Sequence, residues 1–461
     1  MTKGDMLSSI ISFAIPLLFG SLLQTLYNTV DSVVIGNFVG TEALAAVGAC
    51  YSPMMLLLAV MMGLSGGVSV LVSQAFGSGD VKRVREVVAT ASGFFLISVV
   101  PITLCALLMI KPVLAIIDMP AAAMEHATVY LLIVFGGLFG AYGYNLNSGL
   151  LRGLGDSRSP LVFLVIACLV NIVLDLFFVL VMGWGVFGVA IATVTAQIVS
   201  WLYSLVHIKR HFAYLDFRLF SLRIGGGHLK RLLSLSFPMV MNHAFFSLGF
   251  LLYYRFVNGF GPDFMAGYSI AGKVENLTWL PVSSLGMAAI TFAGQNSGAG
   301  NLEWLGRGVK VFLKTAISVN VFAAVVTLFF GRQILGLFSP DAAVVDAGFS
   351  YLACVMPFYW IYAVVHILSS FMNGVGYVRA PALITMVMFW CVRLPVAWYL
   401  SLHASREVLH YSFPISWAVA CVLTVSCFAL GRWKRGMTVR DADAVDNKKP
   451  PPLGLGSKQA A

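Results

Sequence analysis

The chain has 461 residues, of which 59% are hydrophobic and only 10% are charged. About a quarter of the residues in soluble domains are charged, so this composition excludes an ordinary soluble protein and indicates a membrane protein. The formal net charge is +10. Its basic residues gather in the segments between long apolar stretches, a distribution that sets membrane topology and argues against nucleic-acid binding.

Apolar stretches of about 20 residues or more, each long enough to cross a hydrocarbon core of about 30 Å, recur along the whole chain. They predict twelve transmembrane helices, near residues 10–36, 43–75, 87–110, 125–149, 160–183, 186–207, 233–258, 264–296, 310–330, 345–371, 380–402 and 412–431. The predicted fold class is therefore an all-α integral membrane protein, with twelve transmembrane helices in two six-helix lobes.

This division predicts four segments. We expect an N-lobe at residues 1–207, a cytoplasmic inter-lobe linker at 208–232, a C-lobe at 233–435 and a cytoplasmic tail at 436–461. The tail is polar and Pro-rich, which predicts disorder. The first apolar run is long enough to span and lacks a small-residue cleavage pattern, so we interpret it as a retained helix.

The two predicted lobes share sequence motifs. Residues of the first lobe recur 221 positions further along: Gln74, Gly77 and Gly79 as Gln295, Gly298 and Gly300, and Gly153, Gly155 and Pro160 as Gly374, Gly376 and Pro381. Many membrane transporters are built from such repeats, and two similar lobes can rock about a central cavity. We interpret the motifs themselves as structural turns between helices.

Basic residues predict the orientation in the membrane. With the N-terminus in the cytoplasm, most of them fall in cytoplasmic segments such as 82–85, 152–158, 209–231 and 432–435. Only Lys111, Arg332 and Arg406 fall in outside loops. Because basic residues are retained on the cytoplasmic side, we expect both termini there. Short loops are typical of a multi-pass protein of the bacterial inner membrane.

Three carboxylates, Asp31, Asp175 and Glu275, fall within predicted spans. A carboxylate there costs several kcal/mol unless it is paired, hydrated or protonated, and therefore predicts an ion or proton pathway. Asp31 and Asp175 lie at matching depth, roughly 7–12 Å below the outer surface at a rise of about 1.5 Å per residue. The pair could share a proton or hold a cation.

Polar neighbours accompany the two aspartates. Asn171 precedes Asp175 by one helical turn, and Thr193 reaches a similar depth on the next span. Carboxylate, amide and hydroxyl oxygens are hard ligands that suit a small cation. We predict a cation- or proton-coupling site at Asp31, Asn171, Asp175 and Thr193, which would be the metal ligands if the ion is Na⁺. Ordinary hydrogen bonding between helices is the alternative.

The first span also carries a polar stripe and a proline. Gln24, Tyr27, Asn28 and Asp31 recur at helical spacing and share one face. Pro16, inside the same span, removes a backbone hydrogen bond and permits a bend. A helix hinged there could change shape when Asp31 changes charge, so we assign Pro16, Gln24, Tyr27 and Asn28 to the substrate cavity or its gating.

Glu275 lies in the eighth span, at the interface between the repeats, where it could line the substrate cavity. An ion pair with Lys273, two residues away, is the alternative. His243, His366 and Arg393 are further intramembrane polar groups for which the sequence indicates no partner.

Sequence motifs for other functions are weak or missing. Gly183-x-Gly185-x-x-Gly188 matches a dinucleotide-binding fingerprint, but no strand precedes it, and we interpret it as a tight outer hairpin. Neither a Walker sequence, a zinc-ligand cluster nor a nucleophile elbow occurs. We therefore expect neither an ATP-driven pump nor an enzyme, and no cofactor beyond a coupling ion.

Four segments together resemble one transporter family. They are IPLLFGSLLQTLYNTVDSVVIGNFVGTEALAAVG in the first span, VSQAFGSGD after the second, LLRGLGDSRSPL before the fifth and VNIVLDLFFVLVMGWGVFGVAIATVTAQ across the fifth and sixth. Over about residues 8–435, the chain resembles the multidrug and toxic compound extrusion (MATE) efflux transporters. The resemblance implies a V-shaped pair of lobes around a central cavity, and export of organic cations in exchange for Na⁺ or H⁺.

Members with an N-lobe ion site have an aspartate on helix one, an Asn-x-x-x-Asp pair on helix five and a threonine on helix six. The resemblance places these at Asp31, at Asn171 with Asp175, and at Thr193. It also places the family's bending proline at Pro16. These are the positions that the depth and spacing of the polar residues already indicate.

The chain departs from the family pattern in the second lobe. Some members carry a glutamate on helix seven and an aspartate on helix ten. Here the first position is Phe246, and the tenth span has no carboxylate beyond Asp346 at its mouth. This departure disfavours a C-lobe ion site and favours coupling through the N-lobe.

The leading hypothesis is a secondary antiporter that acts as a monomer in the lipid bilayer on small organic cations. A flippase for lipid-linked precursors is the alternative, because related two-lobed folds do that work. The few intramembrane cations disfavour it, and the acid pair disfavours a non-transporting scaffold. The same carboxylates serve Na⁺ and H⁺, so the sequence leaves both ions open.

Overall fold

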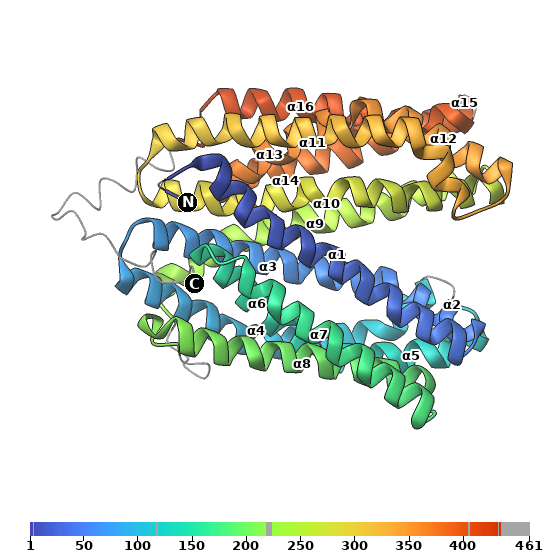
Figure 1. The fold of residues 1–461 in the computed structure, drawn as a ribbon, viewed down its shortest axis with the longest axis horizontal. Helices are drawn as coiled ribbons and strands as arrows, with labels where there is room; N and C mark the ends of the chain where they lie inside the picture. Colours follow the sequence, from blue (N-terminus) through green and yellow to red (C-terminus); the bar gives the residue numbers. More distant parts are fainter. Residues whose placement is uncertain (3, 117–118, 218–223, 404–405, 432, 435–461) are drawn as a thin grey trace.

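The computed structural model describes the chain except for residues 3, 117–118, 218–223, 404–405, 432 and 435–461. The described part is almost entirely helical and contains no strand. Figure 1 shows long helices side by side in two groups. The first group consists of α1 (Met6–Phe38), α2 (Thr41–Ala49), α3 (Tyr51–Gly77), α4 (Val81–Ile116), α5 (Ala121–Gly136), α6 (Leu138–Leu154), α7 (Arg158–Leu176), the π-helix η1 (Phe177–Val181) and α8 (Gly185–His211).

The second group repeats this arrangement. After a 3₁₀ turn, η2 (Ala213–Leu215), it consists of α9 (Gly226–Asn258), α10 (Pro262–Gly298), α11 (Leu302–Gly336), α12 (Ala342–Val355), η3 (Met356–Phe358), α13 (Tyr359–Gly374), α14 (Arg379–Met386), the π-helix η4 (Val387–Arg393), α15 (Leu394–His403), η5 (Arg406–Tyr411) and α16 (Ser412–Ala429). We call the two groups the first half and the second half.

The predicted membrane fold is confirmed. Within the described residues, eleven helical segments are long and apolar enough to cross a membrane. A bent pair, Ala123–Gly136 with Leu138–Leu154, meets at 49° and brings the number to twelve. The interval 208–232, predicted as a linker, includes the end of α8, η2 and the first turns of α9. The predicted tail at 436–461 lies outside the described residues.

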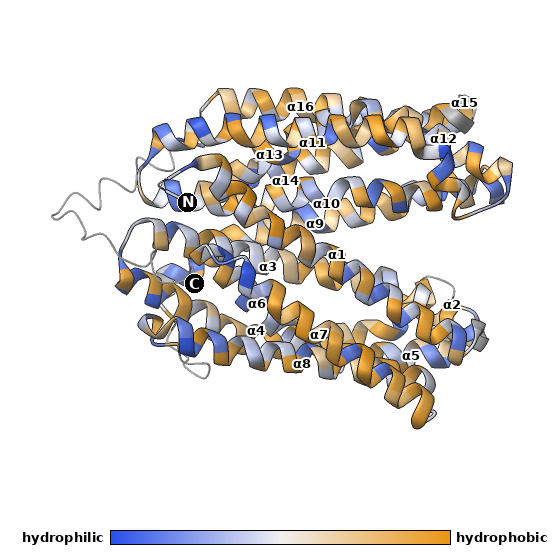
Figure 2. Cartoon of the chain, in the orientation of Figure 1, coloured by the Kyte–Doolittle hydropathy of each residue, from blue (hydrophilic) through white to orange (hydrophobic). Residues whose placement is uncertain are grey.

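The outer faces of the bundle are apolar. Figure 2 shows hydrophobic residues along the lengths of α7, α8, α11 and α16. Large side chains such as Val173, Phe322, Phe329 and Val422 are exposed there, between 65% and 74%. In water such surface would be covered by another protein, whereas in a bilayer it faces hydrocarbon.

Helix α1 contacts both halves and crosses diagonally between them in Figure 1. Near its start, Phe13 and Leu17 pack in a buried cluster with residues of α10, α11 and α13. Near its end, Val34 and Ile35 pack with residues of α2, α5 and α8. Pro16 is buried in the first part, and α1 continues through it without a break. The predicted hinge therefore lies where α1 leaves the second half.

Two equivalent hydrogen bonds join the halves at one end of the bundle. Nε2 of Gln74 donates to the carbonyl oxygen of Gly374 at 2.9 Å, and Nε2 of Gln295 donates to the carbonyl oxygen of Gly153 at 3.1 Å. Each partner lies 221 positions from its counterpart, so the bonds are reciprocal. We call these four residues the glutamine contact and this end of the bundle the glutamine end.

The halves approach each other closely at this contact. A Cβ atom on Gly77 would lie 2.0 Å from the carbonyl oxygen of Gln295, and one on Gly298 would lie 2.1 Å from that of Gln74. No side chain fits at such distances, so glycine is required at both positions. The sequence predicted only that the repeated motifs form turns. In the structure they also hold α3 against α10.

The Gly183-x-Gly185-x-x-Gly188 motif forms the predicted turn. It connects η1 to α8, and Gly183 and Gly185 have φ values of +68° and +52°. Glycine adopts this left-handed conformation without steric cost. The surrounding chain is helical on both sides, which is not the strand–turn–helix context of a dinucleotide site.

Candidate functional site

The predicted acidic site lies among α1, α7 and α8. Asn171 and Asp175 of α7 are 0% exposed, Thr193 of α8 is 2% exposed, and Asp31 of α1 is 7% exposed. Helix α7 packs against both α1 and α8. Asp31 faces Asp175, Asn171 and Thr193 across these contacts. The structure therefore brings together all four residues, and we call them the acidic site.

Local helix geometry positions these side chains. Asn171 and Asp175 are one turn apart, so both project from the same face of α7. Helix α7 passes into the π-helix η1 two residues after Asp175. Single π-helical turns inside longer helices occur frequently at functional sites, because they re-aim the side chains beside them.

Most polar side-chain atoms of the acidic site are buried at distances or angles that form no hydrogen bond. In the described part of the chain, Oδ1 of Asp31, both carboxylate oxygens of Asp175, both side-chain polar atoms of Asn171 and Oγ1 of Thr193 are buried without a partner. Buried polar atoms are almost always paired, since each unpaired one costs about 1–3 kcal/mol. So many unpaired polar atoms in one place is the arrangement that a site for a cation or a proton would require.

The donor set fits a small hard cation. Two carboxylates supply negative charge, and the amide of Asn171 and the hydroxyl of Thr193 supply neutral oxygen atoms. Na⁺ would be held by these four residues, whereas H⁺ would be held by one of the carboxylates alone. Among the described residues, no cluster of three or more His, Cys, Asp or Glu side chains forms a site for a transition metal.

The polar stripe of α1 divides into two parts. Tyr27 and Asp31 are buried, and the hydroxyl of Tyr27 also lacks a partner within the described chain. Gln24 and Asn28 are exposed. Tyr27 therefore belongs with the acidic site, whereas Gln24 and Asn28 lie on the accessible side of α1.

Glu275 has a different partner from the one weighed in the sequence. Its carboxylate accepts a hydrogen bond from the hydroxyl of Tyr351 on α12. The ammonium of Lys273 lies instead 5.7 Å from the ring centroid of Phe338. Two residues apart on a helix, Glu275 and Lys273 point in different directions, which explains why no ion pair forms.

The second half has no acidic site at the two family positions. Phe246 packs against the ring of Phe389, with centroids 5.1 Å apart. Asp346 lies in an ion pair with Arg332, and both side chains are more than half exposed. Arg393, for which the sequence indicates no partner, donates a hydrogen bond to Ser416. The pairing of Glu275 with Tyr351 and of Arg393 with Ser416 could not be found by spacing, because each joins distant helices.

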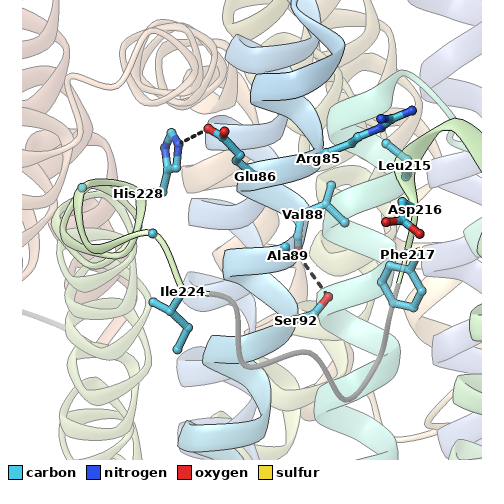
Figure 3. Close-up of a pocket in the computed structure, with 12 residues that line it drawn as sticks. Arg85, Glu86, Val88, Ala89, Ser92, Leu215, Asp216, Phe217, Ile224 and His228 are labelled. Carbon is cyan, nitrogen blue, oxygen red and sulfur yellow. Dashed lines mark hydrogen bonds and ion pairs between the residues drawn. The ribbon is translucent and has the colours of Figure 1, made fainter.

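A pocket of about 630 Å³ lies near the glutamine end, away from the acidic site. Figure 3 shows its walls, which include Arg85, Glu86 and Ser92 of α4 and His228 of α9. Nε2 of His228 pairs with Glu86 at 3.2 Å. Residues 218–223, which connect two of its lining segments, lie outside the described chain, so the pocket supports no assignment.

Known proteins resemble this chain along nearly its whole length. The probable multidrug resistance protein YoeA of Bacillus subtilis is 27% identical over 451 residues, which cover 95% of this chain and 96% of the relative. YpnP of the same organism is 25% identical, covering 94% and 97%. The FAD transporter of Shewanella oneidensis is 21% identical, covering 84% and 86%.

Solved structures share the fold. A crystal structure of MATE in the bent conformation has a TM-score of 0.87 at 23% identity, covering 96% of this chain and 98% of that chain. An outward-facing multidrug resistance MATE transporter has a TM-score of 0.85 at 23% identity, with the same coverage. The MatE family model matches twice, at residues 16–177 and 238–399. These two matches cover most of the chain, which therefore belongs to the MatE family of membrane transporters.

Proposed function

We propose that this protein is a secondary antiporter that exports organic cations, drugs among them, in exchange for Na⁺ or H⁺. The observation that carries the proposal is the acidic site, with its buried and unpartnered oxygen atoms. Two carboxylates deep in a membrane bundle cost several kcal/mol unless an ion or proton neutralises them. A gradient of that ion can then do work on the bundle, because the site is stable only when it is filled.

Filling of the acidic site changes how α1 packs against α7 and α8. Neutral aspartates no longer repel each other, so α1 can approach α7 more closely. Because α1 also packs against the second half through Phe13 and Leu17, a movement of its later part reaches both halves. Binding of the coupling ion and release of the exported substrate are thereby linked through movement of α1.

Pro16 supplies the hinge in this account. Its ring removes one helical hydrogen bond, and α1 leaves the second half near this residue. We expect Pro16→Ala to keep the protein folded but slow gradient-driven export, because the backbone hydrogen bond that alanine restores makes α1 harder to bend. Equal transport rates for Pro16→Ala and the unchanged protein would contradict the hinge.

The glutamine end is proposed to face the cytoplasm. Basic residues at helix ends on this side include Lys82, Arg83, Arg158, Arg307 and Arg379. Basic residues are retained on the cytoplasmic side of membranes, and the relatives from bacteria support a location in a bacterial cell membrane. Both termini are then cytoplasmic, and the acidic site is reached from outside.

Substrate binding is assigned to the space between the halves. Gln24 and Asn28 lie on the accessible side of α1, and Glu275 lies on α10, which contacts both α1 and α3. The names of the relatives YoeA and YpnP support multidrug export, whereas another relative is named an FAD transporter. The monomer contains both halves and is expected to suffice for transport.

The test is transport of a fluorescent organic cation in proteoliposomes, under a Na⁺ gradient or a pH gradient imposed separately. We expect one gradient to drive export by the unchanged protein, and Asp175→Asn to reduce it to the level of protein-free liposomes. Glu303→Gln is the matched control, because Glu303 is an exposed carboxylate paired with Arg307 on α11. Equal gradient-driven export by Asp175→Asn and Glu303→Gln would overturn the proposal.

A further inference from the structure

A buried arginine lies inside the second half. The side chain of Arg393, the last residue of η4, is 1% exposed. Its guanidinium lies 4.2 Å from the ring centroids of both Phe389 and Phe413, and its Nε donates to Oγ of Ser416 at 3.0 Å. Arginine keeps its proton in proteins, so this is a permanent positive charge in a membrane bundle.

One carboxylate shares the cluster with this arginine. Tyr351, which donates its hydroxyl proton to Glu275, packs edge-on against Phe413 with centroids 5.6 Å apart. Phe413 therefore contacts both Tyr351 and Arg393. Arg393 and Glu275 act on each other electrostatically across this aromatic layer. We call Glu275, Tyr351, Phe389, Arg393, Phe413 and Ser416 the arginine cage.

One residue of the arginine cage, Arg393, falls on a position of the acidic site in the internal repeat. The two family matches begin at residues 16 and 238 and end at residues 177 and 399, so both ends are 222 positions apart. That offset pairs Asn171 with Arg393 and Asp31 with Tyr253. Asp175 then corresponds to Ala397, so the second half lacks both aspartates at these positions.

The structure explains the change of offset along the repeat. The prolines at the start of α7 and α14, Pro160 and Pro381, are 221 positions apart, whereas Asn171 and Arg393 are 222 apart. Between them the second half contains η4, a π-helix, and the first half is still α-helical. A π-helical turn accommodates an additional residue, which brings Arg393 into register with Asn171.

The net charge of the acidic site differs from that of the arginine cage. The acidic site holds two carboxylates and no basic side chain, so it needs a cation or proton from outside. The arginine cage holds one carboxylate and one guanidinium, so its charges already balance. The counterpart of Asp31 is Tyr253, a neutral side chain. The hydroxyl oxygen of Tyr253 lies 3.3 Å from Nδ1 of His410.

We propose that Arg393 is the resident cation of the second half, standing where the first half takes its coupling ion, and that it thereby excludes the second half from ion coupling. The inference rests on the proposed function for the ion of the first half. Arg393 then determines that a single acidic site responds to the gradient. It acts by neutralising Glu275 from within the protein, at all times in the cycle.

The test uses purified protein in detergent and follows the thermal midpoint in sodium chloride or choline chloride, at pH 6 and pH 8. Arg393→Met leaves Glu275 without its cation. We expect the midpoint of this variant to fall by about 5 °C or more at pH 8 in choline, and to recover on addition of Na⁺ or on acidification. Arg393→Lys keeps the charge and should gain no such response.

Glu275→Gln in the Arg393→Met background removes the uncompensated carboxylate. We expect it to raise the midpoint again and to abolish the new ion response. If Arg393→Met does not accumulate as folded protein, the double variant should restore it. The proposal would be overturned by a double variant that is no more stable than Arg393→Met. It would also be overturned by a double variant that keeps the additional response to Na⁺ or acid that Arg393→Met gained. Either result would leave Arg393 a packing residue.

The first half provides an independent readout in the same assay. The response of the unchanged protein to Na⁺ or acid should disappear in Asp175→Asn, which tests the proposed function. Its persistence there would contradict N-half coupling without affecting the relation between Arg393 and Glu275. The two proposals can therefore fail separately.

Discussion

The two halves of the chain use the same residues at the glutamine contact and different residues inside the bundle. At the glutamine end, Gln74 and Gln295 make reciprocal bonds to Gly374 and Gly153. Within the membrane, the position of Asn171 in one half is Arg393 in the other. Each residue of the glutamine contact bonds to the opposite half, so a change on either side removes a bond between the halves and both halves constrain these positions. Buried clusters within each half carry no such constraint and can acquire different charges.

The symmetric contact is most sensitive to added volume. We expect Gly77→Ala to destabilise the protein by about 3 kcal/mol, because its Cβ would lie 2.0 Å from a backbone oxygen of α10 and force the helices apart. Gly298→Ala should have the same effect. The thermal midpoint and the yield of monodisperse protein in detergent measure both.

Gly272→Ala is the matched control for these variants. Gly272 lies in the same helix as Gly298, and nothing lies within 4 Å of the Cβ that alanine would add. Alanine favours a helix over glycine, so this variant should be as stable as the unchanged protein or slightly more stable. Equal midpoints for Gly77→Ala and Gly272→Ala would show that the halves are not in close contact at the glutamine end.

Loss of either glutamine should matter less than added volume. Gln74→Met and Gln295→Met each remove the hydrogen bond to the opposite half and deprive a carbonyl oxygen of that donor, at about 1–2 kcal/mol. Gln295→Met also removes the bond that Oε1 accepts from the terminal amine of Met1 at 3.4 Å. Both variants should therefore unfold at a lower temperature than the unchanged protein, as measured by thermal unfolding. Gln333→Met, on the exposed face of α11, is the control. A loss in one variant alone would break the symmetry of the contact.

Two buried threonines, Thr193 and Thr424, offer the variants with the smallest expected change in stability. Comparing them tests whether the hydroxyl of Thr193 serves ion binding rather than packing. Oγ1 of Thr193 and Oγ1 of Thr424 are both buried without a partner in the described chain. Valine has nearly the same shape and no hydroxyl, so each Thr→Val variant should be as stable as the unchanged protein or up to about 1 kcal/mol more stable. Only Thr193→Val should weaken the response of the midpoint to Na⁺ or acid. An equal response in both variants would remove Thr193 from the acidic site.

Periodicity and composition predicted the twelve spans, because a membrane helix must be apolar over about 20 residues and must satisfy its own backbone. The acidic site could be predicted because its members stand out on apolar helices at regular spacing. Asn171 and Asp175 share one face, and the structure places Asp31 and Thr193 opposite them.

The partners of Glu275 and Arg393 in the second half could not be predicted from the sequence. Spacing along one helix does not show which distant helix it will contact, so the partners of Glu275 and Arg393 stayed unknown. Register was a second obstacle, because the repeat shifts from 221 to 222 positions at η4. A repeat comparison with a single offset pairs Asn171 with Val392 and misses Arg393. A π-helix in one half adds a residue to that half, so equivalent positions of the two halves no longer lie at a constant sequence separation.

The most direct test of this asymmetry compares the halves in one transport assay. Asp175→Asn and the Arg393→Met, Glu275→Gln double variant are reconstituted in proteoliposomes, and export of a fluorescent organic cation is measured with and without the driving gradient. We predict that the gradient increases export by the double variant by the same factor as for the unchanged protein, although its absolute rate should fall because Glu275 is assigned to substrate binding. The gradient should not increase export by Asp175→Asn. Stimulation that survives in Asp175→Asn but is lost in the double variant would place ion coupling in the second half and contradict this account.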